Sequence, residues 1–294
     1  MRPDLLVLGV DGGGTNCRAR LCAPSGEVLG EGLAGPANIR LGLETSLAAV
    51  RQATDQCLAQ AGLNSADLPR VTACLALAGA SEPAALAAAQ AQEFPFGHTT
   101  ITTDANAACV GAHGGRDGGV IICGTGSIAW AALKGRRYRL GGWGLIVSDE
   151  GSGAWLGREA LRQVLWAHDG RIAWTDLLRA LFEQFRNDPH AIVRWTTDAS
   201  SRDFGLLAPR VVEYAEHGDP AGIALMQAAA AHIDSLAARL IGLGTSRLAL
   251  VGGLAIPMKA WLSRDIQAYL VTPAGDALDG ALQLARFEAE SIAA

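Results

Sequence analysis

The first residues whose types and spacing suggest chemistry are an aspartate, three glycines and a threonine at positions 11–15. They follow the apolar run of residues 5–10, which has the length of a buried strand, and residues 16–23 are typical of a second strand. Backbone amides in the glycine turn suit phosphate oxygens, while Asp11 suits a hydrated Mg²⁺ and Thr15 a terminal phosphate. A plain hairpin needs fewer glycines, so we favour phosphate binding over a turn without a ligand.

The same arrangement recurs later in the chain. The apolar residues 120–123 lead into Gly-Thr-Gly-Ser at 124–127, and residues 128–140 are typical of two strands joined by a Lys-Gly turn. We interpret the recurrence as an internal duplication of architecture rather than of sequence. Two such turns, each with a hydroxyl side chain, suit a polyphosphate that is gripped from two lobes during phosphoryl transfer.

A dinucleotide-binding fold is the alternative interpretation of the second turn. Residues 124–129 match the fingerprint G-x-G-x-x-A, and Asp149 lies at about the distance expected for a ribose carboxylate. The fingerprint requires a helix directly after the turn, so that its N-terminus faces the pyrophosphate. The sequence predicts a hairpin there, which makes a Rossmann oxidoreductase the minority interpretation. The chain has no G-x-x-x-x-G-K-[ST] motif, which disfavours a P-loop NTPase.

Four further side chains could act on an acceptor. Asp104 follows the β-branched residues 98–103, where a general base for an acceptor hydroxyl would sit, and it can also cap the following helix. Trp143 stands between glycines, and its flat ring suits the face of a sugar as well as the anchoring of a loop. Asp149 can bind hydroxyl groups or cap the next helix. Asn38, in a Gly-Pro-Ala-Asn loop, can turn the backbone or present its amide to a ligand.

Bulk composition disfavours several classes of protein. The 294 residues, 50% of them apolar, can bury a large core and suggest two domains. The net charge of -5 argues against a nucleic-acid or anionic-membrane surface. The apolar run near the N-terminus is too short for a signal or a membrane span, so we expect a cytoplasmic protein. The six cysteines lack a C-x-x-C pair and are expected to be buried thiols.

The order of the predicted elements indicates a mixed α/β protein. The first hundred residues are typical of a β-β-β-α-β-α-β series followed by a short helix, with ligands expected beyond the strand ends. The glycine-rich residues 111–119 are the candidate linker between domains. A last strand is expected to enter the turn at Gly252 and Gly253. Helices are predicted at about 154–167, 174–185, 206–217, 220–243, 257–269 and 276–291.

Five motifs, taken in chain order, resemble one known family. They are Asp-Gly-Gly-Gly-Thr at 11–15, Asp-Ala at 104–105, Gly-Thr-Gly-Ser at 124–127, Gly-Gly-Trp-Gly with Ser-Asp-Glu-Gly-Ser at 141–152, and Gly-Gly at 252–253. This combination resembles the N-acetylglucosamine kinases of the eukaryotic type, in the BadF/BadG/BcrA/BcrD ATPase group of the actin-like sugar kinase and Hsp70 superfold. The resemblance implies an α/β fold of two ribonuclease-H-like lobes, residues 1–111 and 112–294, with the active site in a central cleft. It also implies that the last helix packs back on the first lobe.

The resemblance further implies a role for each matching residue. The implied activity is phosphorylation of the 6-hydroxyl of an amino sugar by Mg-ATP, with Asp104 as the base and Asp11 holding Mg²⁺ through water. The ATP-binding residues are Asp11, Gly13, Gly14, Thr15, Gly124, Thr125, Gly126, Ala215, Gly252 and Gly253. The sugar contacts are Asn38, Asp104, Ser127, Gly142, Trp143 and Asp149. The partners are therefore ATP and an amino sugar, without nucleic acid or membrane, and a homodimer is a further expectation.

Two questions stay open at this point. Residues 37–40 differ in their flanks from the animal kinases, so the acceptor can be N-acetylglucosamine, which stands first, glucosamine or a muramic-type sugar. The dehydratase and reductase activators of the same ATPase group resemble this chain too, and they hold an iron–sulfur cluster at a dimer interface through cysteines. Here Cys123 precedes the second turn and no second suitable cysteine is evident, so an activator ATPase is the less favoured alternative.

Overall fold

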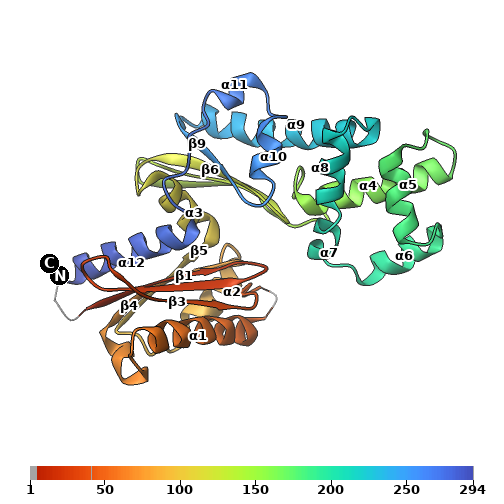
Figure 1. Ribbon diagram of the computed structural model, residues 1–294. Coiled ribbons are helices and arrows are strands. Elements are labelled where there is room, and N and C mark those ends of the chain that lie inside the picture. Colours follow the sequence, from red (N-terminus) through yellow and green to blue (C-terminus); the bar gives the residue numbers. More distant parts are fainter. Residues whose placement is uncertain (1–4, 41, 294) are drawn as a thin grey trace. The chain divides into compact units, whose positions relative to one another are not determined.

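The computed structural model describes residues 5–40 and 42–293, which divide into two compact units. Unit 1 contains the described residues up to Gly118 and those from Thr272 onward, and unit 2 contains Gly119–Val271. Each unit has its own sheet, its own helices and its own buried core (Figure 1). The predicted α/β class with two lobes is confirmed. Among the described residues, no helix is long and apolar enough to cross a membrane.

Unit 1 is built on a five-stranded sheet with the order β3-β2-β1-β4-β5. Its strands are β1 (Leu6–Gly12), β2 (Cys17–Cys22), β3 (Val28–Ala34), β4 (Val71–Leu77) and β5 (His98–Thr103). The first three form an antiparallel meander, while β1, β4 and β5 run parallel. β1 and β4 are apolar and buried along nearly their whole length because helices cover both faces of the sheet.

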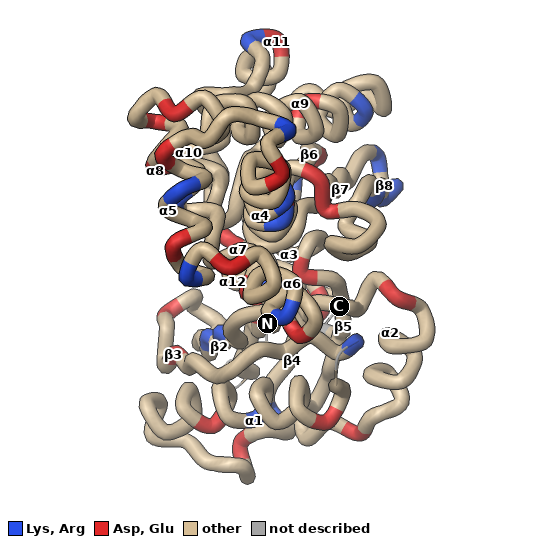
Figure 2. The backbone as a smooth tube through the Cα atoms, turned by 90° about the vertical axis from the view of Figure 1, so that its right-hand side faces the viewer, with Lys and Arg blue, Asp and Glu red and all other residues tan. Residues whose placement is uncertain are grey.

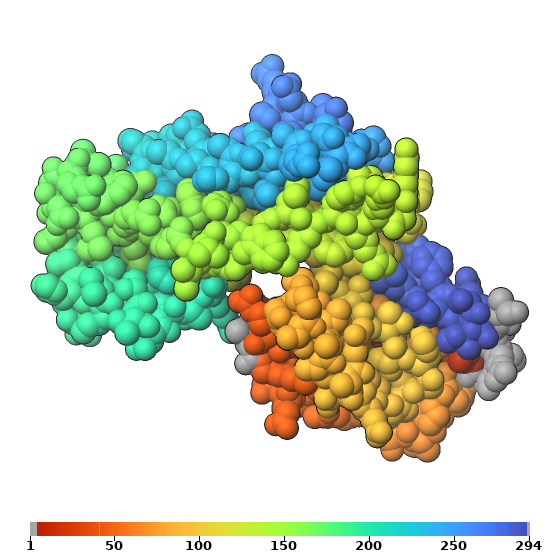
Figure 3. Space-filling model, turned by 180° about the vertical axis from the view of Figure 1, so that it is seen from behind, coloured from red at the N-terminus to blue at the C-terminus, as the bar shows by residue number. Residues whose placement is uncertain are grey.

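The helices of unit 1 pack on both faces of this sheet. One face is covered by α1 (Leu43–Gln60), and the other by α3 (Asp104–His113) and α12 (Ala277–Ala293). The short helix α2 (Pro83–Gln90) and the 3₁₀ turn η1 (Ser65–Arg70) complete the unit. α12 and α3 approach so closely that a Cβ on Gly280 would collide with the Ala107 carbonyl, so only glycine fits at this position. The space-filling view shows α12, in blue, beside the yellow segment that includes α3 (Figure 3).

Unit 2 has a four-stranded sheet with the order β8-β7-β6-β9. Its strands are β6 (Gly118–Cys123), β7 (Ser127–Leu133), β8 (Arg136–Gly141) and β9 (Leu248–Val251). β7 and β8 form the predicted hairpin, and its two turn residues, Lys134 and Gly135, have φ angles of 50° and 77°. Such a pair of positive φ angles matches the twist of the flanking strands. β9 pairs with β6 in parallel.

Most helices of unit 2 lie between β8 and β9 in the chain, and the last two follow β9. They are α4 (Gly153–His168), α5 (Asp176–Gln184), α6 (Pro189–Asp198), α7 (Ser201–Gly205), α8 (Ala208–Glu216), α9 (Pro220–Gly242), α10 (Ala255–Lys259) and α11 (Arg264–Gln267). α6 and α7 lie where the sequence pattern predicts no helix. The single helix predicted at 257–269 is wrong, because Ser263 caps α11 with its hydroxyl and donates its own amide to Asp234 (3.0 Å).

All six cysteines are buried, as the sequence predicts. Burial raises the pKa of the thiols of Cys17, Cys57, Cys74 and Cys123 to about 12. These thiols are therefore neutral at physiological pH, and a neutral buried thiol is a poor nucleophile and metal ligand. Their role is packing.

Candidate functional site

In unit 1, the parallel strands bring the predicted residues to one edge of the sheet. Gly12 lies beside Leu77, and Leu77 beside Thr103, so the carboxyl ends of β1, β4 and β5 are level. Asp11 is near the end of β1, and Asp104 directly follows β5, two strands away. Since neighbouring strands are about 4.8 Å apart, roughly 10 Å of sheet separates the two positions. This edge of a parallel sheet is where α/β proteins bind their ligands.

The glycine turn between β1 and β2 is held at its base and open at its tip. Gly13 donates its amide to the Asn16 carbonyl (2.9 Å) and accepts the Ala37 amide (2.9 Å). Gly14 and Thr15 are exposed, and neither amide has an acceptor in the described chain. Free amides beside a hydroxyl are the groups that bind phosphate oxygens, so this turn fits a phosphate.

Asp11 forms an ion pair with Arg18, which the sequence pattern does not single out. Arg18 lies opposite Asp11 in the β1–β2 ladder and donates to its Oδ2 from Nη2 (2.6 Å) and Nε (3.2 Å). Its Nη1 donates to the carboxylate of Asp276 (2.7 Å), at the start of α12. Burial raises the pKa of Asp11, while Arg18 opposes that shift. Oδ1 of Asp11 accepts no hydrogen bond from the described residues, so this oxygen is available to a hydrated cation.

The residues present fit a Mg²⁺ ion that arrives with a nucleotide. No group of three or more His, Cys, Asp or Glu side chains in the described ranges could form a cage for a metal ion. Mg²⁺ keeps several waters and is commonly held by one or two carboxylates together with the phosphates of a substrate. Asp11 Oδ1, next to the free amides of the β1–β2 turn, meets that requirement.

Asp104 begins α3 and leaves the capping of that helix to its neighbour. Thr103 is the N-cap, and its hydroxyl accepts the Asn106 amide (3.0 Å). Oδ1 of Asp104 accepts the amide of Ala105 (2.8 Å), and the side chain is half-buried. The carboxylate is thus fixed at the sheet edge without serving as the cap, an arrangement that suits a general base.

Asn38 turns the backbone, the first of the two uses that its sequence context allows. It bridges to Ala78, just beyond β4, and its Oδ1 accepts the Arg40 amide (3.2 Å) in a tight turn. Gly79 is packed against it, because a Cβ there would lie 2.5 Å from Asn38 Oδ1, and Gly79 has a φ of +84°. The side-chain nitrogen of Asn38 has no acceptor in the described chain, so it can donate to a ligand.

In unit 2, two glycine turns meet at the ends of neighbouring parallel strands. β6 leads into residues 124–126, while β9 leads into Gly252 and Gly253. A Cβ on Gly124 would lie 3.9 Å from the amide nitrogen of Gly253, so the turns are adjacent. Gly252 has a φ of +102°, and a Cβ there would lie 2.5 Å from the Cys123 carbonyl oxygen, so only glycine fits.

The 124–126 turn also receives the first amides of α4. Gly153 donates to the Gly124 carbonyl (2.8 Å), and Ala154 donates to the Thr125 carbonyl (3.1 Å). The amides of Thr125 and Gly126 have no acceptor in the described chain, and Thr125 is exposed. Since β7 follows directly, no helix N-terminus after the turn faces a pyrophosphate, which excludes the Rossmann alternative. The turn fits phosphate through its own free amides.

Three of the six predicted sugar contacts lie in the loop of residues 141–152, which we call the tryptophan loop. Gly142 has a φ of +71°, and Asp149 has a φ of +59°, which is unusual for a residue with a side chain. Asp149 is only 9% exposed, and its Oδ1 accepts the Gly144 amide (3.1 Å). A Cβ on Gly126 would lie 2.8 Å from Asp149 Oδ2, so this loop and the 124–126 turn are in contact.

Ser127 and Ala215 are both buried rather than displayed. Ser127 donates its hydroxyl to the Glu150 carbonyl (2.8 Å) and so holds the tryptophan loop to β7. Ala215 lies in α8, which begins with Ala208 close to the start of α4. Seven residues of helix, about 10 Å, separate Ala215 from that start. Ala215 packs against Gly222 of α9, where a Cβ would lie 2.8 Å from the Ala215 amide nitrogen, and its contact with ATP stays a prediction.

Trp143 is the most conspicuous side chain of the tryptophan loop. It is 60% exposed, between Gly142 and Gly144. The guanidinium of Arg139, from β8, lies 3.9 Å from the centre of its indole. Arg139 is the second residue that the sequence pattern does not single out.

A shared signal could have revealed both arginines. β2 carries Arg18 and Arg20, and β8 carries Arg137 and Arg139, so each strand has basic residues two positions apart. In a strand, such residues lie on one face and project toward the same neighbour. The sequence does not disclose the register, which decides that one faces Asp11.

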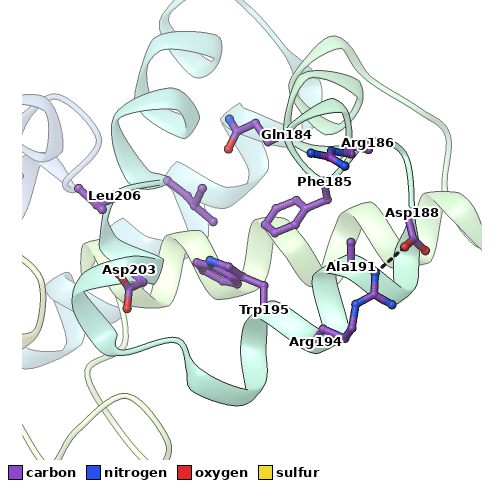
Figure 4. Close-up of a pocket in the computed structure, with 10 residues that line it drawn as sticks. Gln184, Phe185, Arg186, Asp188, Ala191, Arg194, Trp195, Asp203 and Leu206 are labelled. Atoms are coloured by element: carbon purple, nitrogen blue, oxygen red, sulfur yellow. Dashed lines mark hydrogen bonds and ion pairs between the residues drawn. The ribbon is translucent and has the colours of Figure 1, made fainter.

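The helical part of unit 2 contains a cavity of about 680 Å³ that is separate from these residues (Figure 4). It is lined by Gln184, Phe185, Arg186, Asp188, Ala191, Arg194, Trp195, Asp203, Leu206 and Leu207. Arg194 pairs with Asp188 (2.9 Å), and Asp203 accepts the Ser200 hydroxyl (2.6 Å), so much of the polar rim is satisfied internally. None of the site residues predicted from the sequence lines it.

Comparison with known proteins supports the family suggested by the motifs. The model of the BadF/BadG/BcrA/BcrD ATPase family matches residues 8–285. The chain is 41% identical over 278 residues to the glucosamine kinase GspK of Vibrio cholerae, and the match covers 95% of each protein.

Solved structures support the fold. A candidate N-acetylglucosamine kinase from Chromobacterium violaceum is 34% identical with a TM-score of 0.90, covering 96% of this chain and 100% of that one. A ROK-family glucokinase from Streptomyces griseus, solved with glucose and AMPPNP, is 18% identical with a TM-score of 0.53, covering 96% and 98%. The second likeness concerns the fold alone, and it agrees with the expected α/β fold of two lobes. The chain belongs to the BadF/BadG/BcrA/BcrD ATPase family.

Proposed function

We propose that this chain is an ATP-dependent amino-sugar kinase and that glucosamine is its preferred acceptor. The observation that carries the proposal is the 41% identity to a glucosamine kinase across 95% of both proteins. The 34% identity to a candidate N-acetylglucosamine kinase supports the same class of acceptor. N-acetylglucosamine, which stands first on the motifs, becomes the second candidate.

In this proposal, unit 1 supplies the base and the metal side. Asp104 takes the proton of the 6-hydroxyl as that oxygen bonds to the γ-phosphorus and the bond to ADP breaks. The amides of Gly14 and Thr15 hold phosphate oxygens, with Gly13 fixing the turn. When bound, Mg²⁺ would neutralise negative charge on the phosphates. Asp11 would hold that ion through water with its Oδ1.

Unit 2 supplies the second set of phosphate amides and the sugar contacts. The free amides of Thr125 and Gly126, with the adjacent Gly252 and Gly253, suit ATP. Trp143 and Asp149 suit the sugar ring and its hydroxyls. The contact between Asp149 and Gly126 supports this role, because it places the tryptophan loop beside the 124–126 turn within one unit.

A coupled assay of ADP release tests the proposal. Glucosamine, N-acetylglucosamine, N-acetylmuramate and glucose are offered as acceptors with Mg-ATP, and phosphorylated sugar is identified by mass spectrometry. We expect the highest kcat/KM with glucosamine. Higher kcat/KM with N-acetylglucosamine would overturn the acceptor but keep the class. ADP release that needs no sugar would favour the activator ATPase alternative, and no turnover with any acceptor would overturn the kinase itself.

The homodimer expected from the motifs also belongs to this proposal. Light scattering after gel filtration measures it directly, since the chain mass is 30.4 kDa. We expect twice that mass, and a mass of one chain at micromolar concentration would contradict it.

A further inference from the structure

The backbone around Trp143 leaves its indole ring little support of its own. The two neighbours of Trp143 are glycines with φ angles of +71° and +102°, and the ring is 60% exposed. Glycine offers no side chain against which the ring could pack, and it permits backbone motion that other residues resist. Something else must therefore fix the ring if it is to serve as a platform.

Arg139 provides that support through two contacts. Its guanidinium lies 3.9 Å from the centre of the indole ring, within the range of a cation–π interaction. Its Nη2 donates to the carbonyl of Gly142, the residue before Trp143, at 2.6 Å. Arg139 itself lies in β8, opposite Trp130 of β7, so its backbone is fixed by the sheet.

The residue after Trp143 is held from another direction. The amide of Gly144 donates to Asp149 Oδ1 (3.1 Å), and Asp149 is nearly buried. The backbone is thus held on both sides of Trp143, because Arg139 binds the carbonyl before it and Asp149 binds the amide after it. Arg139 lies on a strand, and Asp149 has a left-handed backbone conformation.

We propose that Arg139 is a positioning residue for the sugar, which acts through Trp143. Its planar guanidinium covers the ring and leaves the exposed indole surface to stack on the acceptor. This inference rests on the proposed function, since it assigns the acceptor to Trp143. It predicts that loss of Arg139 weakens the use of the sugar and leaves the use of ATP unchanged.

The test compares Arg139→Met with Arg137→Met. Arg137 lies two residues earlier on the same strand, is exposed, and forms no ion pair or hydrogen bond with the described residues. Basic residues gather on β8 (Figure 2), so both variants remove one charge from the same cluster. We expect R139M to raise the KM for glucosamine about tenfold, the change that about 1.4 kcal/mol produces. We expect the KM of R139M for ATP to stay within about twofold of the wild-type value. The KM values of R137M for ATP and for glucosamine should stay within the same range.

A double-mutant cycle separates positioning from a merely structural effect. In the Trp143→Ala background, R139M should change the sugar KM less than about twofold, because the ring through which Arg139 acts is gone. Arg139→Lys, which keeps the charge but not the fork, should restore only part of the loss.

Three outcomes overturn the proposal. The first is that R139M and R137M have the same KM for the sugar. The second is that R139M raises the KM for ATP as much as the KM for the sugar. The third is that the effects of R139M and W143A on the sugar KM are fully additive. A wild-type enzyme that phosphorylates no amino sugar would instead overturn the proposed function, and the inference with it. Melting temperatures of all variants identify any change that comes from unfolding.

Discussion

The two glycine turns of this chain look alike in sequence and are held in place by different forces. The β1–β2 turn of unit 1 ends in a charged network, in which Arg18 joins Asp11 to Asp276 at 2.6 and 2.7 Å. The β6–β7 turn of unit 2 is held by backbone bonds, since α4 donates two amides to its carbonyls. A strand–glycine–strand pattern thus predicts a turn but not what fixes it. The position of the first turn depends on ion pairs, and that of the second on backbone hydrogen bonds.

The space around the two turns differs in the same way. A Cβ added to Gly14 would meet nothing within 4 Å, whereas one added to Gly126 would lie 2.8 Å from Asp149 Oδ2. The first turn is open where a phosphate is expected to bind. The second turn is covered by the carboxylate of Asp149, which we propose as a contact of the sugar. This difference fits the proposal that unit 1 supplies the base and binds the phosphate and that unit 2 positions the sugar.

The largest effect is expected from Asp104→Asn, which removes the proposed base and keeps its shape. Loss of a general base lowers turnover by about 10²- to 10⁴-fold. We expect kcat with glucosamine to fall in that range, while binding of a fluorescent ATP analogue stays near the wild-type value.

Thr103→Ala is the matched control for D104N. It removes the cap of the same helix and costs about 1 kcal/mol of stability, but it should keep most of the turnover. Near-normal kcat in D104N would show that the base lies elsewhere and would break the division between the two units.

The next effect distinguishes the two turns by one methyl group each. Gly14→Ala fits the fold, so it should leave the melting temperature unchanged and raise the KM for ATP about tenfold by entering the phosphate space. Gly126→Ala must displace the Asp149 carboxylate, so it should raise the KM for glucosamine by a similar factor. Equal effects of both variants on both substrates would remove the contrast. An unchanged KM for ATP in G14A would remove phosphate from the first turn.

Most strands of this fold could be predicted because their patterns are strong and local. β1 and β4 are unbroken apolar runs, and β7 and β8 flank a Lys-Gly turn that permits little else. The failures have two physical causes. α6 and α7 are short and carry mostly exposed polar residues, with few buried apolar positions to mark a helix, and the break at Ser263 depends on a distant partner, Asp234.

Some residues of the candidate site could likewise be predicted from local sequence, and others could not. Glycines and acids that follow strands are visible in one sequence, because the strand end itself is visible. The arginines that hold them are not, since Arg18 meets Asp11 only through the β1–β2 register, and Asp276 lies more than 250 residues away from either. The cap of α3 is another example. Asp104 is a good capping residue by type, but the helix begins one position earlier and Thr103 takes that role.

A smaller effect is expected from Arg18→Met, which removes the cation shared by Asp11 and Asp276. The arginine is partly exposed, so we expect a loss of about 1 kcal/mol in the free energy of unfolding, together with weaker ATP binding. Arg20→Met is the control, because Arg20 pairs with Glu31 and with Asp279 of α12 but not with the turn. It should lose stability without a change in ATP affinity. Urea denaturation and titration with an ATP analogue measure both quantities, and equal ATP affinities for R18M and the wild type would show that ions do not hold the turn.

The smallest expected change in stability, and the most specific, concerns Asp11→Asn. Burial raises the pKa of Asp11 above its ordinary value of 3.8, against the influence of Arg18, so the folded state favours the neutral carboxyl. A raised carboxyl pKa means that the folded state holds the proton longer than the unfolded state, and stability is lost as the pH rises from about 3.8 through the raised pKa. The neutral asparagine avoids that loss, so D11N should be slightly more stable than the wild type at neutral pH while its activity falls.

The pH dependence of that difference is the decisive measurement. The free energy of unfolding of D11N and of the wild type is measured with urea between pH 3.5 and pH 8. The difference should be smallest at the acid end, where Asp11 is mostly protonated in both states, and should grow until the pH passes the raised pKa. Carboxyls remote from Asp11 titrate alike in both proteins and cancel, whereas Asp276, which shares Arg18 with Asp11, contributes to the measured difference. A D11N protein that is less stable than the wild type at neutral pH would mean that the bond to Arg18 outweighs burial, and that the ion pair of the first turn stabilises the fold as well as the site.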